Sequence, residues 1–247
     1  MSGNRRIKGT IHMHTTLSHD GTLSLEELVD FLKARGSDFI AVTDHSYDID
    51  QAGIDGQVAR ARELSTPEFL IIPGIEFRCH DSIDILGYGV TRTCGSDDPG
   101  TIIEHIKNRG GVAVWAHPTV KDYPIDREWI EKLDGFEIWN SGNEGKLMPQ
   151  IRTLKMYRRL KKWNPQLKAY CGLDLHRKTT YDAVFIEVVA GNREEILAAM
   201  RRGDYRSRGR LLRLNSMARI NPFCLIFIYS VRYLLSAVRW IRDRLHI

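Results

Sequence analysis

Residues 9–14 have the sequence GTIHMH, an apolar run that ends in two histidines, and short apolar runs alternate with helical patterns from there on. The runs FIAV (39–42), FLII (69–72) and VAVW (112–115) are apolar at every position. Runs of this kind are typical of parallel strands that are covered on both faces. The sequence therefore predicts buried strands joined by helical connections.

The segments between the runs carry helix signals. Ser24 and Glu27 have the spacing of a capping box, and Gly36 can adopt the left-handed backbone conformation that ends a helix. The apolar stripe between these signals consists of Leu25, Leu28, Val29 and Leu32. About seven strands that alternate with such helices predict an α/β barrel or a barrel-like sheet.

Composition sets the broad class of the protein. The chain has 247 residues, of which 43% are apolar and 27% charged, enough for one sizeable domain and unlike a disordered or collagen-like chain. The four cysteines form no C-x-x-C pair, and the first 30 residues contain no apolar core of a signal peptide. We expect a cytoplasmic protein without disulfides.

Charge divides the chain in two. Residues 1–200 hold 25 Lys and Arg against 29 Asp and Glu, whereas residues 201–247 hold 11 Arg, no Lys and two Asp. A mildly acidic body with a basic end indicates that the end meets something negative. We expect a catalytic barrel over residues 1–203 and a basic amphipathic tail over residues 204–247.

The tail contains an apolar helix pattern that starts at Pro222. Arg232, near its middle, disfavours a membrane span. A helix lying on an anionic leaflet suits Tyr229, Tyr233 and Trp240, which would make the protein peripheral on the inner membrane face. Docking on the barrel or on a second subunit is the alternative, and the apolar pattern disfavours a nucleic-acid polymer as partner.

Polar residues end most of the apolar runs. In an α/β barrel the carboxyl ends of all strands open at one mouth, so residues distant in sequence become neighbours there. Imidazole and carboxylate groups that meet in this way predict a metal site. The run-ending residues are His12, His14, His45, Glu76, His117, Asn140, Asp174 and His176.

Spacing supports this chemistry. His12 and His14 lie two apart, so both face the same side of a strand, and Asp174 and His176 repeat the arrangement. Asp20, in the loop after the first strand, can add an oxygen. Nitrogen and oxygen donors without thiolates suit Zn, Mn or Fe, and this many donors indicate two or three ions that activate water for hydrolysis.

Six motifs occur in an order that resembles the PHP domain (polymerase and histidinol phosphatase) family, over about residues 7–190. They are IHMHTTLSHDGTLSLEEL (11–28), FIAVTDH (39–45), IIPGIEF (71–77), ILGYG (85–89), GGVAVWAHP (110–118) and GLDLH (172–176). The resemblance implies a distorted (β/α)7 barrel, similar to a TIM barrel, with a trinuclear metal centre at its mouth. It also implies hydrolysis of phosphate esters.

The resemblance implies metal ligands at the matching positions. These are His12, His14, Asp20, His45, Glu76 as a bridging carboxylate, His117, Asp174 and His176. Family members commonly have His directly before the I-L-G-Y segment, where this chain has Asp84. Asp84 can ligate through oxygen, and His80 offers an alternative nitrogen. This departure bears on metal preference and on catalytic competence.

A phosphate substrate requires cationic side chains beyond the metals. Arg78, Arg177 and Lys178 follow strand-end ligands and are the predicted clamp, with surface ion pairs as the alternative and Lys121 as a weaker candidate. Asp20, His117 and His176 are candidates for proton transfer, and the sequence leaves open which of the two histidines is a ligand and which a free acid.

These patterns favour a metal-dependent hydrolase of small phosphate mono- or diesters, such as a nucleotide or sugar phosphate. A metal-dependent amide or ester hydrolase on the same barrel is one alternative, because the same ions activate water for either bond. A non-catalytic module recruited by its tail to a membrane or partner is the other.

Overall fold

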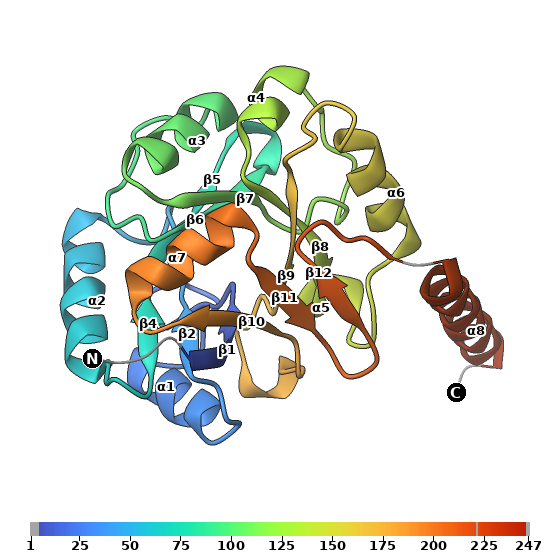
Figure 1. Ribbon diagram of the computed structural model, residues 1–247, viewed down its shortest axis with the longest axis horizontal. Helices are drawn as coiled ribbons and strands as arrows, with labels where there is room; N and C mark the ends of the chain where they lie inside the picture. The colour runs from blue at the N-terminus through green and yellow to red at the C-terminus, as the bar shows by residue number, and fades with distance from the viewer. Residues whose placement is uncertain (1–4, 221, 246–247) are drawn as a thin grey trace.

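Strands and helices alternate along residues 5–220 and 222–245, the part of the chain that the computed structural model describes, apart from the side chains of residues 239, 241–243 and 245 (Figure 1). The strands are β1 (Arg5–Ile11), β2 (Phe39–Ala41), β3 (Asp44–His45), β4 (Leu70–Ile72), β5 (Gly74–Arg78), β6 (Asp84–Tyr88), β7 (Val112–Trp115), β8 (Gly135–Asn140), β9 (Lys168–Gly172), β10 (Phe185–Ala190), β11 (Tyr205–Arg208) and β12 (Arg213–Asn215). The helices are α1 (Leu25–Lys33), α2 (Gln51–Leu64), α3 (Pro99–Asn108), α4 (Arg127–Lys132), α5 (Ser141–Glu144), α6 (Ile151–Leu160), α7 (Arg193–Arg202) and α8 (Pro222–Leu245), with 3-10 turns η1 (His80–Ser82) and η2 (Lys178–Thr180). The result is a mixed α/β fold.

Two six-stranded sheets form the centre of the molecule. Their strand orders are β12-β11-β10-β1-β2-β4 and β3-β5-β6-β7-β8-β9. Backbone hydrogen bonds join them beyond the ends of β1 and β9: Leu173 N donates to Ile11 O (3.0 Å), and Thr43 N donates to Met13 O (2.8 Å). The chain just after β1 therefore lies between the two sheets, and this is where the predicted ligands His12 and His14 are placed.

The sheets are less parallel than the sequence predicts. β6 pairs antiparallel with both β5 and β7, and β10, β11 and β12 pair antiparallel with their neighbours. The cause at β6 is the short connection Cys79–Ile83, because a parallel crossover needs a dozen or more residues. Apolar runs alone do not distinguish the two directions, since both kinds of strand are buried here.

The helix over α1 forms as its local signals predict. Ser24 Oγ accepts from Glu27 N (3.2 Å) while Ser24 N donates to the Glu27 carboxylate (2.9 Å), which completes the capping box. The apolar stripe is buried, and Gly36 has a φ of 72°, in the left-handed region. The positions of helices such as α1 relative to their strands thus follow from short-range chemistry.

The basic end of the chain has two structural parts. β11 and β12 continue the first sheet from β10, so the sheet runs to Asn215, past the boundary expected at residue 203. α8 then lies at the periphery beside α6 (Figure 1), with Ile228 fully buried on its packed face.

Among the described residues, no helix is both long enough and apolar enough to cross a bilayer.

Candidate metal centre

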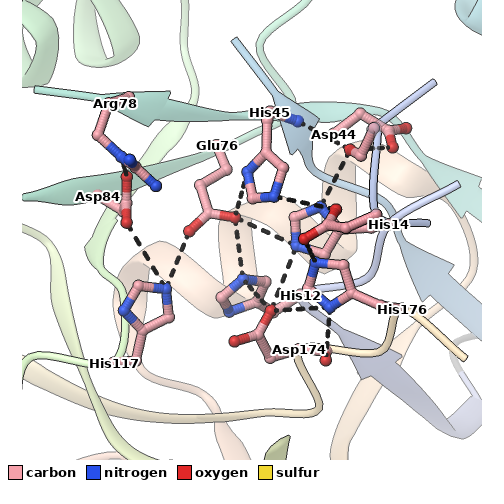
Figure 2. Close-up of polar contacts among 12 residues, drawn as sticks. His12, His14, Asp44, His45, Glu76, Arg78, Asp84, His117, Asp174 and His176 are labelled. Atoms are coloured by element: carbon pink, nitrogen blue, oxygen red, sulfur yellow. Dashed lines mark hydrogen bonds and ion pairs between the residues drawn. The ribbon is translucent and has the colours of Figure 1, made fainter. Parts of the chain in front are cut away.

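Strands from both sheets deliver the predicted ligands to one place. His12 and His14 follow β1, His45 ends β3, and Glu76 lies within β5. Asp84 begins β6, His117 follows β7, and Asp174 and His176 follow β9. Only His12 and His14 come from the first sheet, because β3, β5, β6, β7 and β9 all belong to the second. Figure 2 shows these side chains pointing toward one another around Glu76.

Glu76 is the centre of the arrangement. Its Oε2 lies 3.1 Å from His14 Nε2, 3.2 Å from His12 Nε2 and 3.3 Å from His45 Nδ1. Its Oε1 lies 3.1 Å from His117 Nε2. One carboxylate thus faces four imidazoles from three separate segments, as a bridging ligand would.

Asp174 provides the second shared carboxylate. Its Oδ1 lies 3.3 Å from both His12 Nε2 and His14 Nε2, and 3.6 Å from His176 Nδ1. The ligands of the centre form three overlapping groups, and within each group the ligand atoms lie within 4.8 Å of one another. The groups are His14, His45 and His176; His12, His14, Glu76 and Asp174; and Glu76, Asp84 and His117.

Glu137 and Asn140 on β8 support the ligands from behind. Glu137 Oε1 lies 2.9 Å from His12 Nδ1, and Glu137 Oε2 accepts from His117 N and from Asn140 Nδ2, both at 2.9 Å. A carboxylate on the far nitrogen of a ligand histidine sets the tautomer and the ring orientation. The structure therefore places Glu137 where it orients both the ring of His12 and the backbone of His117.

A second network holds the loop after His14. Asp44 accepts from Thr15 N (2.7 Å), from Thr15 Oγ1 (2.9 Å) and from Ser18 Oγ (2.7 Å). Ser18 Oγ also lies 3.2 Å from His14 Nδ1. Asp44 is fully buried next to His45, so it fixes two ligands at once.

Backbone strain is concentrated at the ligands. His12, His117 and Asp174 have φ angles of 61°, 26° and 52°. Non-glycine residues rarely adopt this region, and such strain costs of order 1–3 kcal/mol each. The surrounding contacts therefore hold the backbone of these three residues in an unfavourable conformation, which is common at functional sites.

Charge and burial oppose each other at the centre. Burial disfavours the imidazolium forms of His14 and His117, but contacts with Glu76 and Asp174 raise the pKa of each to about 9. Burial likewise disfavours ionised Glu76, yet the charge of His12 and the hydrogen bonds from the histidines lower its pKa well below the ordinary value. The carboxylates thus stay ionised and require positive charge beside them.

The donor set fits divalent cations. Glu76, Glu137 and Asp174 are at most 9% exposed, and within residues 5–220 and 222–245 their ion-pair partners are histidines. Buried carboxylates are costly without compensating charge. His14 Nε2, His45 Nδ1 and His176 Nε2 also lie 3.1–3.3 Å from carboxylate oxygens without forming a hydrogen bond of normal geometry among the described residues. Cations bound at the three groups would neutralise the carboxylates and accept the lone pairs of these ring nitrogens.

The position where the family commonly has His is occupied by a carboxylate with its own cation. Asp84 pairs with Arg78 Nε, and Asp84 Oδ2 lies 3.8 Å from His117 Nε2. Burial and the charge of Glu76 raise the pKa of Asp84. His80 is half exposed, with its Nδ1 3.0 Å from Asp81, and belongs to none of the three groups. Asp84, and not His80, reaches the centre.

A cavity of about 320 Å³ opens onto the ligands. Arg78 and Lys121 line it, and Arg78 also lies over the Tyr47 ring, 5.0 Å from its centroid. Arg177 and Lys178 do not line it, because the chain turns away into η2 after His176 and the Lys178 ammonium lies over Phe31 of α1. Of the predicted clamp, only Arg78 reaches the site.

Asp20 lies at the rim of this cavity. Its Oδ2 is 3.2 Å from His176 Nε2, and its Oδ1 is 3.5 Å from His45 Nε2. His19, its neighbour, pairs instead with Asp48, 2.8 Å away. The cavity thus brings together all three candidates for proton transfer, Asp20, His117 and His176.

Sequence reasoning missed three residues of the site, Asn143, Asp44 and Tyr47. Asn143, in α5, donates a hydrogen bond from Nδ2 to the Asp174 carboxylate. It does not end an apolar run, so the sequence carried no signal for it. Asp44 precedes His45 in the TDH motif, and its position beside a ligand was the signal available for it. Tyr47 also lines the cavity from the loop after β3.

The comparisons with known proteins agree on family and fold. The model of the PHP domain family matches residues 10–209. No curated protein matches the chain.

Three solved structures are similar in fold. A two-domain protein from Bacteroides vulgatus with a predicted PHP-like metal-dependent phosphoesterase matches with a TM-score of 0.64 and 18% identity, over 93% of this chain and 71% of that one. PsfC from Pseudomonas syringae matches with a TM-score of 0.58 and 14% identity, over 92% and 99%. A predicted metal-dependent phosphoesterase from Bifidobacterium adolescentis matches with a TM-score of 0.50 and 17% identity, over 69% of this chain and 88% of that one.

Proposed function

Because the chain belongs to the PHP domain family, we propose that it is a metal-dependent phosphoesterase that hydrolyses small phosphate mono- or diesters. The observation that carries the proposal is Glu76, a buried carboxylate within 3.3 Å of four imidazoles from three segments of the chain. A nucleotide or sugar phosphate is the size of substrate that the cavity of about 320 Å³ favours.

The three ligand groups support two or three divalent ions, with Zn, Mn or Fe favoured by the mixed nitrogen and oxygen donors. When bound, such ions supply a nucleophilic hydroxide near neutral pH and neutralise charge on phosphoryl oxygens. His12, His14 and Asp174 would hold one ion with Glu76. His45 and His176 would hold a second with Asp20, whose carboxylate lies 3.5 Å and 3.2 Å from their ring nitrogens. Asp84 and His117 would hold a third with Glu76.

The remaining side chains of the cavity act on the substrate. Arg78 faces the cavity beside Asp84, so its guanidinium can donate to two phosphate oxygens while Asp84 holds its orientation. Lys121, on the same wall, adds a second cation. Asp20, His117 and His176 border the same space and are our candidates for giving a proton to the departing alkoxide.

The orienting residues keep this set in place. Glu137 fixes the His12 ring, and Asn143 and Asn140 donate to Asp174, so a ligand carboxylate does not rotate away from the centre. Preorganised donors and acceptors of this kind lower the cost of stabilising charge during the reaction. The strained backbone at His12 and Asp174 is consistent with such preorganisation.

The hydrogen bonds that join the two sheets also support a finer description of the fold. With residues 11–14 bonded to both Thr43 and residues 173–175, we propose that the strands form the distorted (β/α)7 barrel that the resemblance implies. In this description the ligands occupy the mouth of the barrel.

The test is hydrolysis by the full chain after removal of metal and reconstitution with Mn, Zn or Fe. A panel of phosphate mono- and diesters, carboxylic esters and amides is assayed while bound metal is measured by elemental analysis. We expect phosphate release with two or three equivalents of metal. Turnover of a carboxylic ester or amide with no phosphate substrate would show the alternative hydrolase, and less than one equivalent without turnover would show a non-catalytic module.

A further inference from the structure

α8 has one face that is packed on the body of the protein. Ile228 is fully buried, and Leu225 and Val231 are half buried against the core. Arg232 donates to the carbonyl oxygens of Glu144 (3.0 Å) and Pro149 (3.1 Å) and to that of Met148. The guanidinium in the middle of the helix is therefore hydrogen-bonded within the protein, to backbone carbonyls at the end of α5 and in the loop between α5 and α6.

The opposite face of α8 is apolar and open to solvent. Phe223 is 84% exposed, Tyr233 76%, and Trp240 57%. Single exposed apolar residues are ordinary, but a continuous face of them marks an interaction surface. We define the outer face of α8 as Phe223, Ile226, Phe227, Tyr229, Tyr233, Leu234, Val238 and Trp240, all exposed.

Cations flank this outer face. Arg219, just before α8, is exposed, and the exposed Arg244 near its end lies over the Trp240 ring, 4.2 Å from the centroid. Residues 201–247 contain 11 arginines and two aspartates. The partner of the outer face must therefore offer both apolar volume and negative charge.

These two requirements select among the occupants. A second copy would bring two arginine-rich ends together, and like charges in one interface are unfavourable. A nucleic acid offers phosphates but no apolar volume for Phe223 and Leu234 to enter. The surface of an anionic bilayer offers both, and Tyr and Trp are enriched at its boundary.

We propose that the outer face of α8 lies on an anionic lipid bilayer, parallel to its plane, with Arg219 and Arg244 at the headgroups. α8 is an interfacial helix and not a span, because its other side packs on the loop after α5 through Ile228 and Arg232. The rigid attachment through Arg232 also sets the orientation of the catalytic domain on the membrane. The inference is independent of the proposed phosphoesterase activity.

The experiment measures binding of the full chain to vesicles of phosphatidylcholine alone and to vesicles of phosphatidylcholine and phosphatidylserine in a 3:1 ratio. Sedimentation is combined with quenching of Trp240 by brominated acyl chains. We expect binding to the anionic vesicles, weakening as salt is raised, and quenching that is lost in Trp240→Phe. Equal binding to both vesicles, or binding to neither, would overturn the proposal.

Two matched variants locate the surface. Leu234→Glu places a charge in the outer face and should weaken anionic-vesicle binding by about tenfold or more. Val189→Glu changes an equally apolar side chain, 52% exposed on β10 and outside α8, and should bind like the parent. Equal loss in both variants, or concentration-dependent dimers that Leu234→Glu abolishes without any vesicle binding, would contradict the bilayer as occupant.

Discussion

The metal centre and α8 use charged residues in opposite ways. At the centre, buried carboxylates and imidazoles from both sheets meet around Glu76. In α8 the one central cation, Arg232, is bonded to backbone carbonyls, and the exposed face is apolar. The first region concentrates buried carboxylates, and the second leaves apolar side chains exposed. Each feature indicates the chemistry of what binds there.

The comparison also predicts that the two regions are separable. Residues of the centre contact one another through side chains between the two sheets, whereas the outer face of α8 makes its contacts, on our proposal, only outside the protein. Changes at the centre should therefore affect metal and turnover, and changes on the outer face should affect membrane binding.

Glu76→Ala should produce the largest loss. It removes the carboxylate shared by His12, His14, His45 and His117, so we expect bound metal to fall and phosphoester turnover to drop by about 10³-fold. Elemental analysis and initial rates measure both. Glu194→Ala, on an exposed turn of α7, is the control, and vesicle binding should be equal in the two proteins. Retained metal and rate in Glu76→Ala would refute the centre.

Glu144 lies where the two regions meet, with its carbonyl oxygen on Arg232 and its carboxyl on Thr119 and Thr153. Burial raises the pKa of this carboxyl to about 7 from 4.5. The folded protein then holds the proton at pH values where the unfolded chain has released it, so this group lowers stability as pH rises from about 4.5 through 7.

Glu144→Gln should remove that penalty. Relative to the parent, we expect its free energy of unfolding to increase by about 3 kcal/mol at pH 9 and by little at pH 4. Urea unfolding at the two pH values provides the measurement, with Glu194→Gln as the control. An equal difference at both pH values would mean that Glu144 ionises normally.

Arg78→Ala tests the substrate side with a smaller effect. Loss of the guanidinium from the cavity wall should raise KM for a phosphate ester by about tenfold, with kcat changed less. Arg177→Ala is the matched control, because Arg177 follows a ligand in sequence but does not line the cavity. If Arg177→Ala raises KM and Arg78→Ala does not, the placement of the clamp is wrong.

Short-range patterns predicted a large part of this molecule. His12 and His14 both face the centre as the sequence predicts, although they lie beyond the end of β1 and His12 has a left-handed backbone, so strand alternation is not what places them. The boundaries of α1 followed from Ser24, Glu27 and Gly36, because caps depend on neighbouring residues. The antiparallel direction of β6 was not predicted, since its apolar pattern is the same in either direction.

The sequence by itself determined which groups could bind metal and that the chain ends in an apolar helix with arginines, because these depend on residue type and period. The tertiary structure decided which ligands are shared through Glu76, that Arg78 reaches the cavity while Arg177 and Lys178 do not, and that Arg232 caps the loop beyond α5. These are contacts between segments far apart in the chain. They depend on where packing brings the loops, which no local pattern encodes.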